Sequence, residues 1–174
     1  MFREAKFLLL LFIVAPAIGC SRQETAQQSA VERGQYLVNV GGCHDCHTPK
    51  VPGPEGAPVL DTARMLSGHP QNLPPPSWSP ADMAQKNVAA ATNSMLTAWA
   101  GPWGVSFAAN LTPDKETGIA EWSEELFIQM ARTGKHQGPP NARDILPPPQ
   151  LKDVTDADLK TMWAYLKSKS TGEK

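Results

Sequence analysis

A C-x-x-C-H pentad at residues 43–47 constrains this chain more than any other feature of its sequence. Cys43 and Cys46 lie three residues apart, and His47 follows directly. Thiols at i and i+3 lie on one side of a helical turn, where both can add to the two vinyl groups of a protoporphyrin, and the next imidazole can then bind the iron. The pentad therefore predicts one haem c per chain, with Cys43 and Cys46 as thioether attachments and His47 as the proximal iron ligand.

Other uses of two such cysteines fit the sequence less well. A zinc site needs two further ligands at suitable spacing, and His47 is too close to Cys46 for the usual zinc arrangements. A redox-active C-x-x-C pair usually opens a helix in a thioredoxin-like αβ pattern, which the sequence lacks. A structural disulfide would leave His47 without a role. His44, inside the pentad, is expected to be solvated and not to bind iron.

The first twenty residues have the pattern of an export signal. Two basic residues precede an apolar run at 7–18 that is too short to span a bilayer comfortably, and small residues then precede Cys20. The pattern resembles the bacterial lipobox, which implies removal of residues 1–19, lipidation of Cys20 and, with Ser21 next, the outer membrane. The expected location is the periplasmic side of a bacterial membrane, held by a lipid anchor. Cleavage that leaves a soluble periplasmic protein is the alternative.

Polar composition and capping residues predict where the tether, helices and loops lie in the rest of the chain. Residues 20–30 lack an apolar period and are expected to tether the lipid to one domain at 31–169. Ser123 and Thr155 are good N-caps, and Gly134 can end a helix. The predicted helices cover residues 31–40, 121–134 and 155–169, with a further helix within 82–100. Proline-rich stretches between them are expected to be loops, and no segment shows the alternation of a strand.

Together these features resemble class I c-type cytochromes, in particular monohaem domains related to the cytochrome subunits of bacterial membrane-bound alcohol and aldehyde dehydrogenases. The resemblance covers residues 31–168 and includes N-L-T-P-D at 110–114, followed by T-G-I and W-S. It implies an all-α cytochrome c fold, with about three to five helices around one covalent haem and long proline-rich loops. It also implies that Gly34 lets the first helix cross the last near Tyr165 and Leu166.

The resemblance further implies single-electron transfer between redox proteins of the dehydrogenase or oxidase type. The redox chemistry would belong to the haem, and the protein would not itself be an enzyme. A formal net charge of −1 gives no indication of nucleic-acid binding.

The second iron ligand is where the sequence departs from the family it resembles. Related domains carry a methionine between prolines shortly before the last helix, whereas the loop at 145–150 reads I-L-P-P-P-Q. Three alternatives stay open: an open or weakly ligated iron, a histidine, or a displaced methionine. The candidate side chains are His136, His69, Met65, Met83 and Met95. An open distal site would favour a haem-based binder or sensor of small gases such as NO or CO, which is the alternative to an electron carrier.

Overall fold

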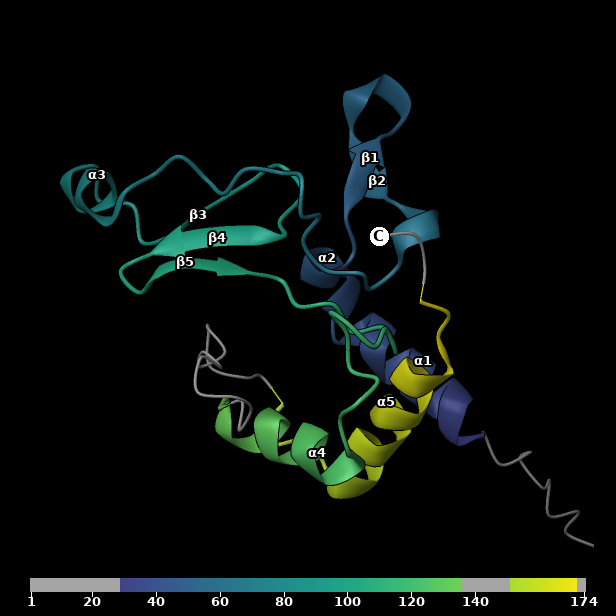
Figure 1. Cartoon of the computed structure of the whole chain (residues 1–174). Helices are drawn as coiled ribbons and strands as arrows, with labels where there is room; N and C mark the ends of the chain where they lie inside the picture. Colours follow the sequence, from purple (N-terminus) through teal and green to yellow (C-terminus); the bar gives the residue numbers. More distant parts are fainter. Residues whose placement is uncertain (1–28, 136–150, 172–174) are drawn as a thin grey trace, which may run out of the picture.

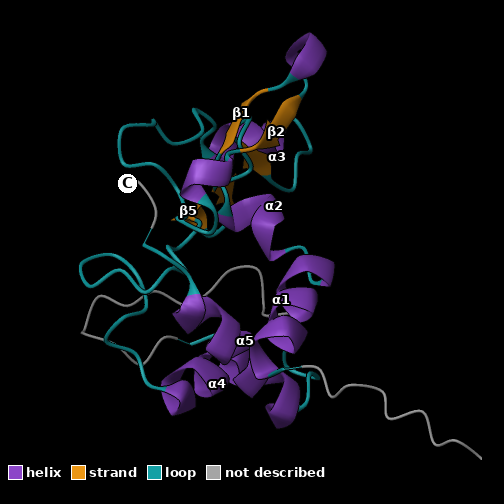
Figure 2. Cartoon of the chain, turned by 90° about the vertical axis from the view of Figure 1, so that its right-hand side faces the viewer, coloured by secondary structure: helices purple, strands orange, loops and turns teal. Residues whose placement is uncertain are grey.

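The computed structural model describes residues 29–135 and 151–171, which fold into a helical half and a strand-bearing half (Figure 1). The helical half contains α1 (Ala30–Val40), α4 (Glu124–Thr133) and α5 (Asp156–Ser168). Figure 2 shows these three helices together at one end of the molecule, with the strands at the other end. The short helix α2 (Cys43–His47) lies where the two halves meet.

The crossing of α1 and α5 is the most extensive contact between elements of the described chain. Gly34 is buried at this crossing, where a Cβ atom would overlap the backbone carbonyl of Thr161 and lie 2.8 Å from Cβ of Tyr165. Arg33 and Asp158 form an ion pair at 3.0 Å beside it. The predicted crossing at Gly34 is therefore confirmed, because only a residue without a side chain lets the two backbones approach this closely.

Local capping explains why the three long helices form where the sequence predicts them. Ser29 and Glu32 make a reciprocal capping box at the start of α1, so the last residues of the predicted tether belong to this helix. The hydroxyls of Ser123 and Thr155 each accept a backbone N–H from the first turn of α4 and α5. Gly134 ends α4 with a φ of +68°.

The predicted all-α fold is wrong. Over residues 29–135 and 151–171 the structure is 39% helix and 13% strand, a mixed α/β arrangement with two small antiparallel sheets. The strands are β1 (Lys50–Pro52), β2 (Pro58–Leu60), β3 (Ala91–Thr92), β4 (Ala98–Gly101) and β5 (Gly104–Phe107). Strands of two to four residues are too short to show the period-two alternation that marks a strand in a sequence.

The strand-bearing half replaces most of the loop expected after the pentad. β1 and β2 form a hairpin, and β3, β4 and β5 form the second sheet in that order. The further helix expected within residues 82–100 is only α3 (Pro80–Gln85), and β3 and most of β4 occupy later parts of that range. Two short 3₁₀ helices, Pro54–Gly56 and Thr62–Arg64, complete this half.

Among the described residues, each helix is too short or too polar to cross a bilayer. The expected export signal at 1–19, Cys20 and most of the expected tether lie outside the described residues, as does the proline-rich loop at 136–150.

Candidate haem-binding site

Both thiols of the pentad are carried by α2, directly after a sharp turn out of α1. Gly42 forms this turn with a φ of +66°, which glycine adopts without a steric penalty. Cys43 and Cys46 are free and half-buried. Burial is the largest effect on each thiol and raises the pKa of both Cys43 and Cys46, so both are protonated at neutral pH.

His47 is held in one tautomer by a backbone carbonyl from a distant part of the sequence. Its Nδ1 lies 2.8 Å from the carbonyl oxygen of Ala109. A carbonyl only accepts, so Nδ1–H is the donor and, in the neutral ring, Nε2 carries the free lone pair. Burial is the main effect on this ring and lowers the pKa of His47, so the imidazole is neutral at physiological pH. A neutral imidazole oriented through Nδ1 is the usual form of a metal-binding histidine.

Three backbone segments, residues 47–48, 66–69 and 108–111, form what we call the proximal frame, which holds α2 and the Ala109 carbonyl at a set separation. The joining hydrogen bonds run from Gly68 N–H to the His47 carbonyl (2.8 Å), from Leu66 N–H to the Thr48 hydroxyl (2.9 Å), from Leu111 N–H to the Leu66 carbonyl (2.8 Å) and from His69 N–H to the Ala108 carbonyl (2.9 Å). The middle segment bonds to both of the others, so it determines where the carbonyl lies relative to the imidazole.

Leu66 is the residue of the frame with the least favourable backbone conformation. Its φ is +62°, and its side chain is completely buried in the main hydrophobic core. The left-handed conformation costs a residue with a side chain roughly 1–2 kcal/mol. Burial of the leucine side chain, worth roughly 1.5–3 kcal/mol, offsets this cost.

His44 is buried, which corrects the prediction that it is solvated. Its Nδ1 lies 2.9 Å from the hydroxyl of Thr48, the same hydroxyl that accepts the N–H of Leu66. Burial, and secondarily the positive charge of Lys169, lower the pKa of His44. A neutral His44 therefore connects α2 to the proximal frame through one completely buried hydroxyl.

The structure holds His69 in place through both ring nitrogens. Nε2 lies 3.1 Å from the carbonyl of Leu73 and must donate to it, while Nδ1 lies 3.0 Å from the hydroxyl of Thr97. The ring of Phe107 packs against it at 4.8 Å between centroids. These contacts weigh against His69 as a ligand that swings to the iron.

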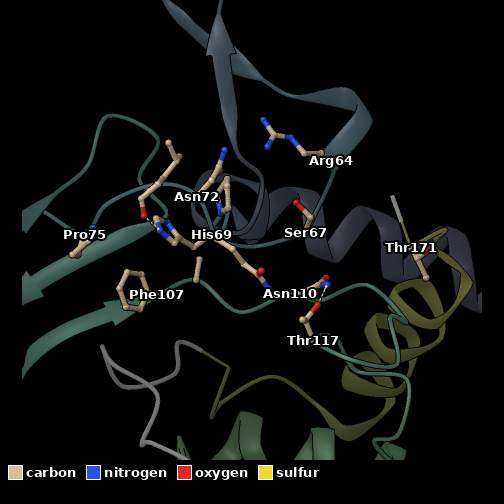
Figure 3. A pocket seen from close by; sticks show the side chains of 13 residues that line it. Arg64, Ser67, His69, Asn72, Pro75, Phe107, Asn110, Thr117 and Thr171 are labelled. Atoms are coloured by element: carbon tan, nitrogen blue, oxygen red, sulfur yellow. Dashed lines mark hydrogen bonds between the residues drawn. The ribbon is translucent and has the colours of Figure 1, made fainter. Parts of the chain in front are cut away.

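His69 lines a cavity of about 750 Å³ that borders the proximal frame (Figure 3). Asn110 and Thr117, joined by a side-chain hydrogen bond of 2.9 Å, lie on one side, and Arg64 and Ser67 lie on another. The residues that line this cavity do not include the two thiols or the imidazole of the pentad.

The methionine candidates for the distal position lie in different parts of the strand-bearing half. Met83 is buried in α3, and Met65 is half-buried at the end of a 3₁₀ helix. The backbone of Met95 is tied to α2, because the ammonium group of Lys50 donates both to its carbonyl (2.8 Å) and to the carbonyl of Asp45 (2.5 Å). His136, the remaining candidate, lies outside the described residues.

Sequence reasoning missed the residues that support the imidazole. Ala109 is 62 positions from His47, and Thr48 and Gly68 belong to no motif that carries a known role. The adjacent N-L-T-P-D motif at 110–114 marks the right region, but it does not identify the carbonyl before it as the hydrogen-bond acceptor.

The donor set of the described site fits haem c. Two protonated thiols lie one helical turn apart, and the imidazole beside them has its Nδ1 proton committed to a backbone carbonyl. Covalent attachment needs the two thiols, and iron ligation needs the free lone pair of Nε2.

Comparison with known proteins supports this assignment at the level of a family. No protein-family profile matches the chain. Two curated proteins are similar over 160 residues, or 92% of the chain: the gluconate 2-dehydrogenase cytochrome c subunit of Pantoea cypripedii (25% identical) and the cytochrome c subunit of alcohol dehydrogenase (quinone) of Gluconobacter oxydans (21% identical). A segment of 69 residues, 40% of the chain, is 33% identical to a nicotinate dehydrogenase subunit of Pseudomonas putida.

The chain spans only about a quarter of the length of the two cytochrome c subunits, 28% and 26% respectively, and 6% of the nicotinate dehydrogenase subunit. The similarity supports the cytochrome c family, as the pentad predicts, and these relatives imply haem c as the cofactor.

Proposed function

We infer that the chain is a monohaem c-type cytochrome that transfers single electrons between redox proteins on the periplasmic side of a bacterial membrane. The observation that carries this proposal is the geometry of His47, whose Nδ1–H donates to Ala109 at 2.8 Å beside the free thiols of Cys43 and Cys46. This arrangement leaves Nε2 as the nitrogen available to iron.

The residues of the chain would attach, orient and shield the haem. Cys43 and Cys46 would hold the haem through two thioethers, each made by adding one S–H bond across one vinyl group, so that no leaving group is needed. His47 would supply an iron ligand, and the Ala109 carbonyl, which accepts the Nδ1 proton in a hydrogen bond, would increase the basicity of that ligand. When bound, the haem supplies a one-electron couple of its iron.

The proposed partner is a dehydrogenase or an oxidase. Support comes from the names of the relatives, two of which are cytochrome c subunits of dehydrogenases. The chain corresponds to about a quarter of each of these subunits, so we propose the electron-carrying role and not the activity of a whole complex.

Expression of the full chain in a bacterium with a cytochrome c maturation system tests the proposal. The expected product carries one haem per chain that acid–acetone does not extract, gives the pyridine haemochrome spectrum of haem c, and titrates as a single one-electron couple. A product without covalent haem would contradict the proposal, as would one that neither accepts an electron from a small reductant nor returns it to ferricyanide.

A haem-based binder of NO or CO is the second candidate function. Two observations favour an open distal site: the chain has no methionine between Met130 and Met162, and both ring nitrogens of His69 are engaged. Rapid CO binding by the reduced protein, together with a high-spin ferric spectrum, would favour this candidate. A low-spin ferric spectrum with a methionine-to-iron charge-transfer band would instead favour a simple carrier with a displaced methionine ligand.

We also propose that Cys20 is lipidated after removal of residues 1–19 and anchors the domain to the membrane, with the outer membrane favoured. The support is the apolar run followed by small residues and Cys20. The full chain is expected to fractionate with membranes and to partition into detergent, whereas the Cys20→Ser variant stays in the aqueous phase. Equal partitioning of the two proteins would favour the soluble periplasmic alternative.

A further inference from the structure

Gly68 lies against the carbonyl that orients His47. Its φ is +78°, and an added Cβ atom would lie 2.6 Å from the carbonyl carbon of Ala109, 2.7 Å from its oxygen and 2.6 Å from the oxygen of Ala108. Real Cβ atoms essentially never approach backbone atoms so closely, so a side chain at residue 68 must displace the Ala108–Ala109 backbone. The carbonyl oxygen of Ala109, which would move with this backbone, is the atom that accepts Nδ1–H of His47.

Gly68 is also bonded directly to α2. Its N–H donates to the carbonyl of His47 at 2.8 Å, so one residue contacts both the backbone of the histidine and the acceptor of its side chain. Thr48 and Leu66 hold the preceding part of the same segment through a hydrogen bond of 2.9 Å. The separation between His47 and the Ala109 carbonyl therefore depends on the missing side chain at residue 68.

We propose that Gly68 is a positioning residue for the iron-binding histidine: by allowing the Ala109 carbonyl to lie 2.8 Å from Nδ1 of His47, it keeps the reduction potential of the haem low. The inference rests on the proposed function. A hydrogen bond from Nδ1–H makes the imidazole a more basic ligand, and a more basic ligand stabilises ferric over ferrous iron. A carbonyl moved out of this position accepts a weaker bond, so the potential rises.

The test compares Gly68→Ala with Gly56→Ala in the full-length haem-loaded protein. Gly56 has almost the same φ, +80° against +78°, but a Cβ there would meet nothing within 4 Å. Gly56→Ala thus reproduces the backbone strain of alanine at positive φ without displacing a neighbour. The readouts are the potential by spectroelectrochemical titration and the NMR signal of the His47 Nδ1 proton.

Gly68→Ala is expected to shift the ferric-to-ferrous ratio at a fixed ambient potential about tenfold toward ferrous iron, equivalent to about +59 mV for a one-electron couple. Its Nδ1 proton is expected to move upfield and to exchange faster with solvent. Gly56→Ala is expected to match the wild type in both readouts. An unchanged or lowered potential in a folded Gly68→Ala protein would overturn the proposal, and so would an equal shift in Gly56→Ala.

A second pair of variants tests the same segment without adding a side chain at residue 68, in case alanine there prevents folding. Thr48→Val removes the hydroxyl that accepts the Leu66 N–H, whereas Thr48→Ser keeps it. The valine variant is expected to raise the potential by less than Gly68→Ala, and the serine variant to restore the wild-type value. A Thr48→Val protein with the wild-type potential would overturn the proposal.

The outcomes separate this inference from the proposed function. A wild-type chain without covalent haem would contradict both. A wild-type chain with a reversible one-electron couple, whose potential does not respond to Gly68→Ala or Thr48→Val, would leave the proposed function standing and remove the positioning role alone.

Discussion

Replacing Cys43 and Cys46 together by serine is expected to reduce covalently bound haem from one per chain to none. The two residues are the thiols of α2, and both occupy half-buried positions on the helix that carries His47. A hydroxyl does not form the thioether, so the attachment is lost even if the helix folds. Haem retention after acid–acetone extraction and the pyridine haemochrome spectrum measure the effect.

The matched control for this pair is Cys20→Ser, which removes the remaining cysteine of the chain. It is expected to keep the full haem content while losing the membrane anchor. Single replacements of Cys43 or Cys46 are expected to give products with one thioether and a red-shifted spectrum, because one vinyl group stays unreacted. Full covalent haem in the double variant would refute the assignment of these two residues.

The second large effect is expected from Gly34→Ala, which should lower the free energy of unfolding by about 2 kcal/mol. A Cβ at residue 34 overlaps the Thr161 carbonyl and approaches Cβ of Tyr165 to 2.8 Å. Overpacking of this kind costs about 3 kcal/mol, and the better helix propensity of alanine returns about 1 kcal/mol. Because α1 and α5 make the principal helix contact, the crossing must open before the side chain fits.

Denaturant titration of the haem-loaded protein measures this loss as a lower midpoint with an unchanged slope. Gln35, exposed on the same helix, offers a matched control: the difference between Gln35→Gly and Gln35→Ala isolates the propensity effect of glycine and alanine at an exposed position. Alanine should be the more stable residue at position 35 and the less stable one at position 34. The same sign at both positions would show that the α1–α5 crossing does not depend on Gly34.

The helices were predictable because their signals are local. Ser123 and Gly134 bracket α4, and Thr155 begins α5, as their side chains and backbone preferences dictate. The strand-bearing half was not predictable in this way. Its strands are so short that pairing between residues such as Lys50 and Leu60, not periodicity along the chain, defines them.

The sequence by itself predicted the chemistry of the site: two thiols at i and i+3 and an imidazole after them are typical of haem attachment. Only the tertiary structure decided which nitrogen of His47 keeps a free lone pair, because the acceptor of the other nitrogen is Ala109, 62 residues away. It also decided that Gly68 must lack a side chain. Spacing within five residues follows from the geometry of one helical turn, whereas contacts between distant segments depend on how the chain folds and leave no periodic trace in the sequence.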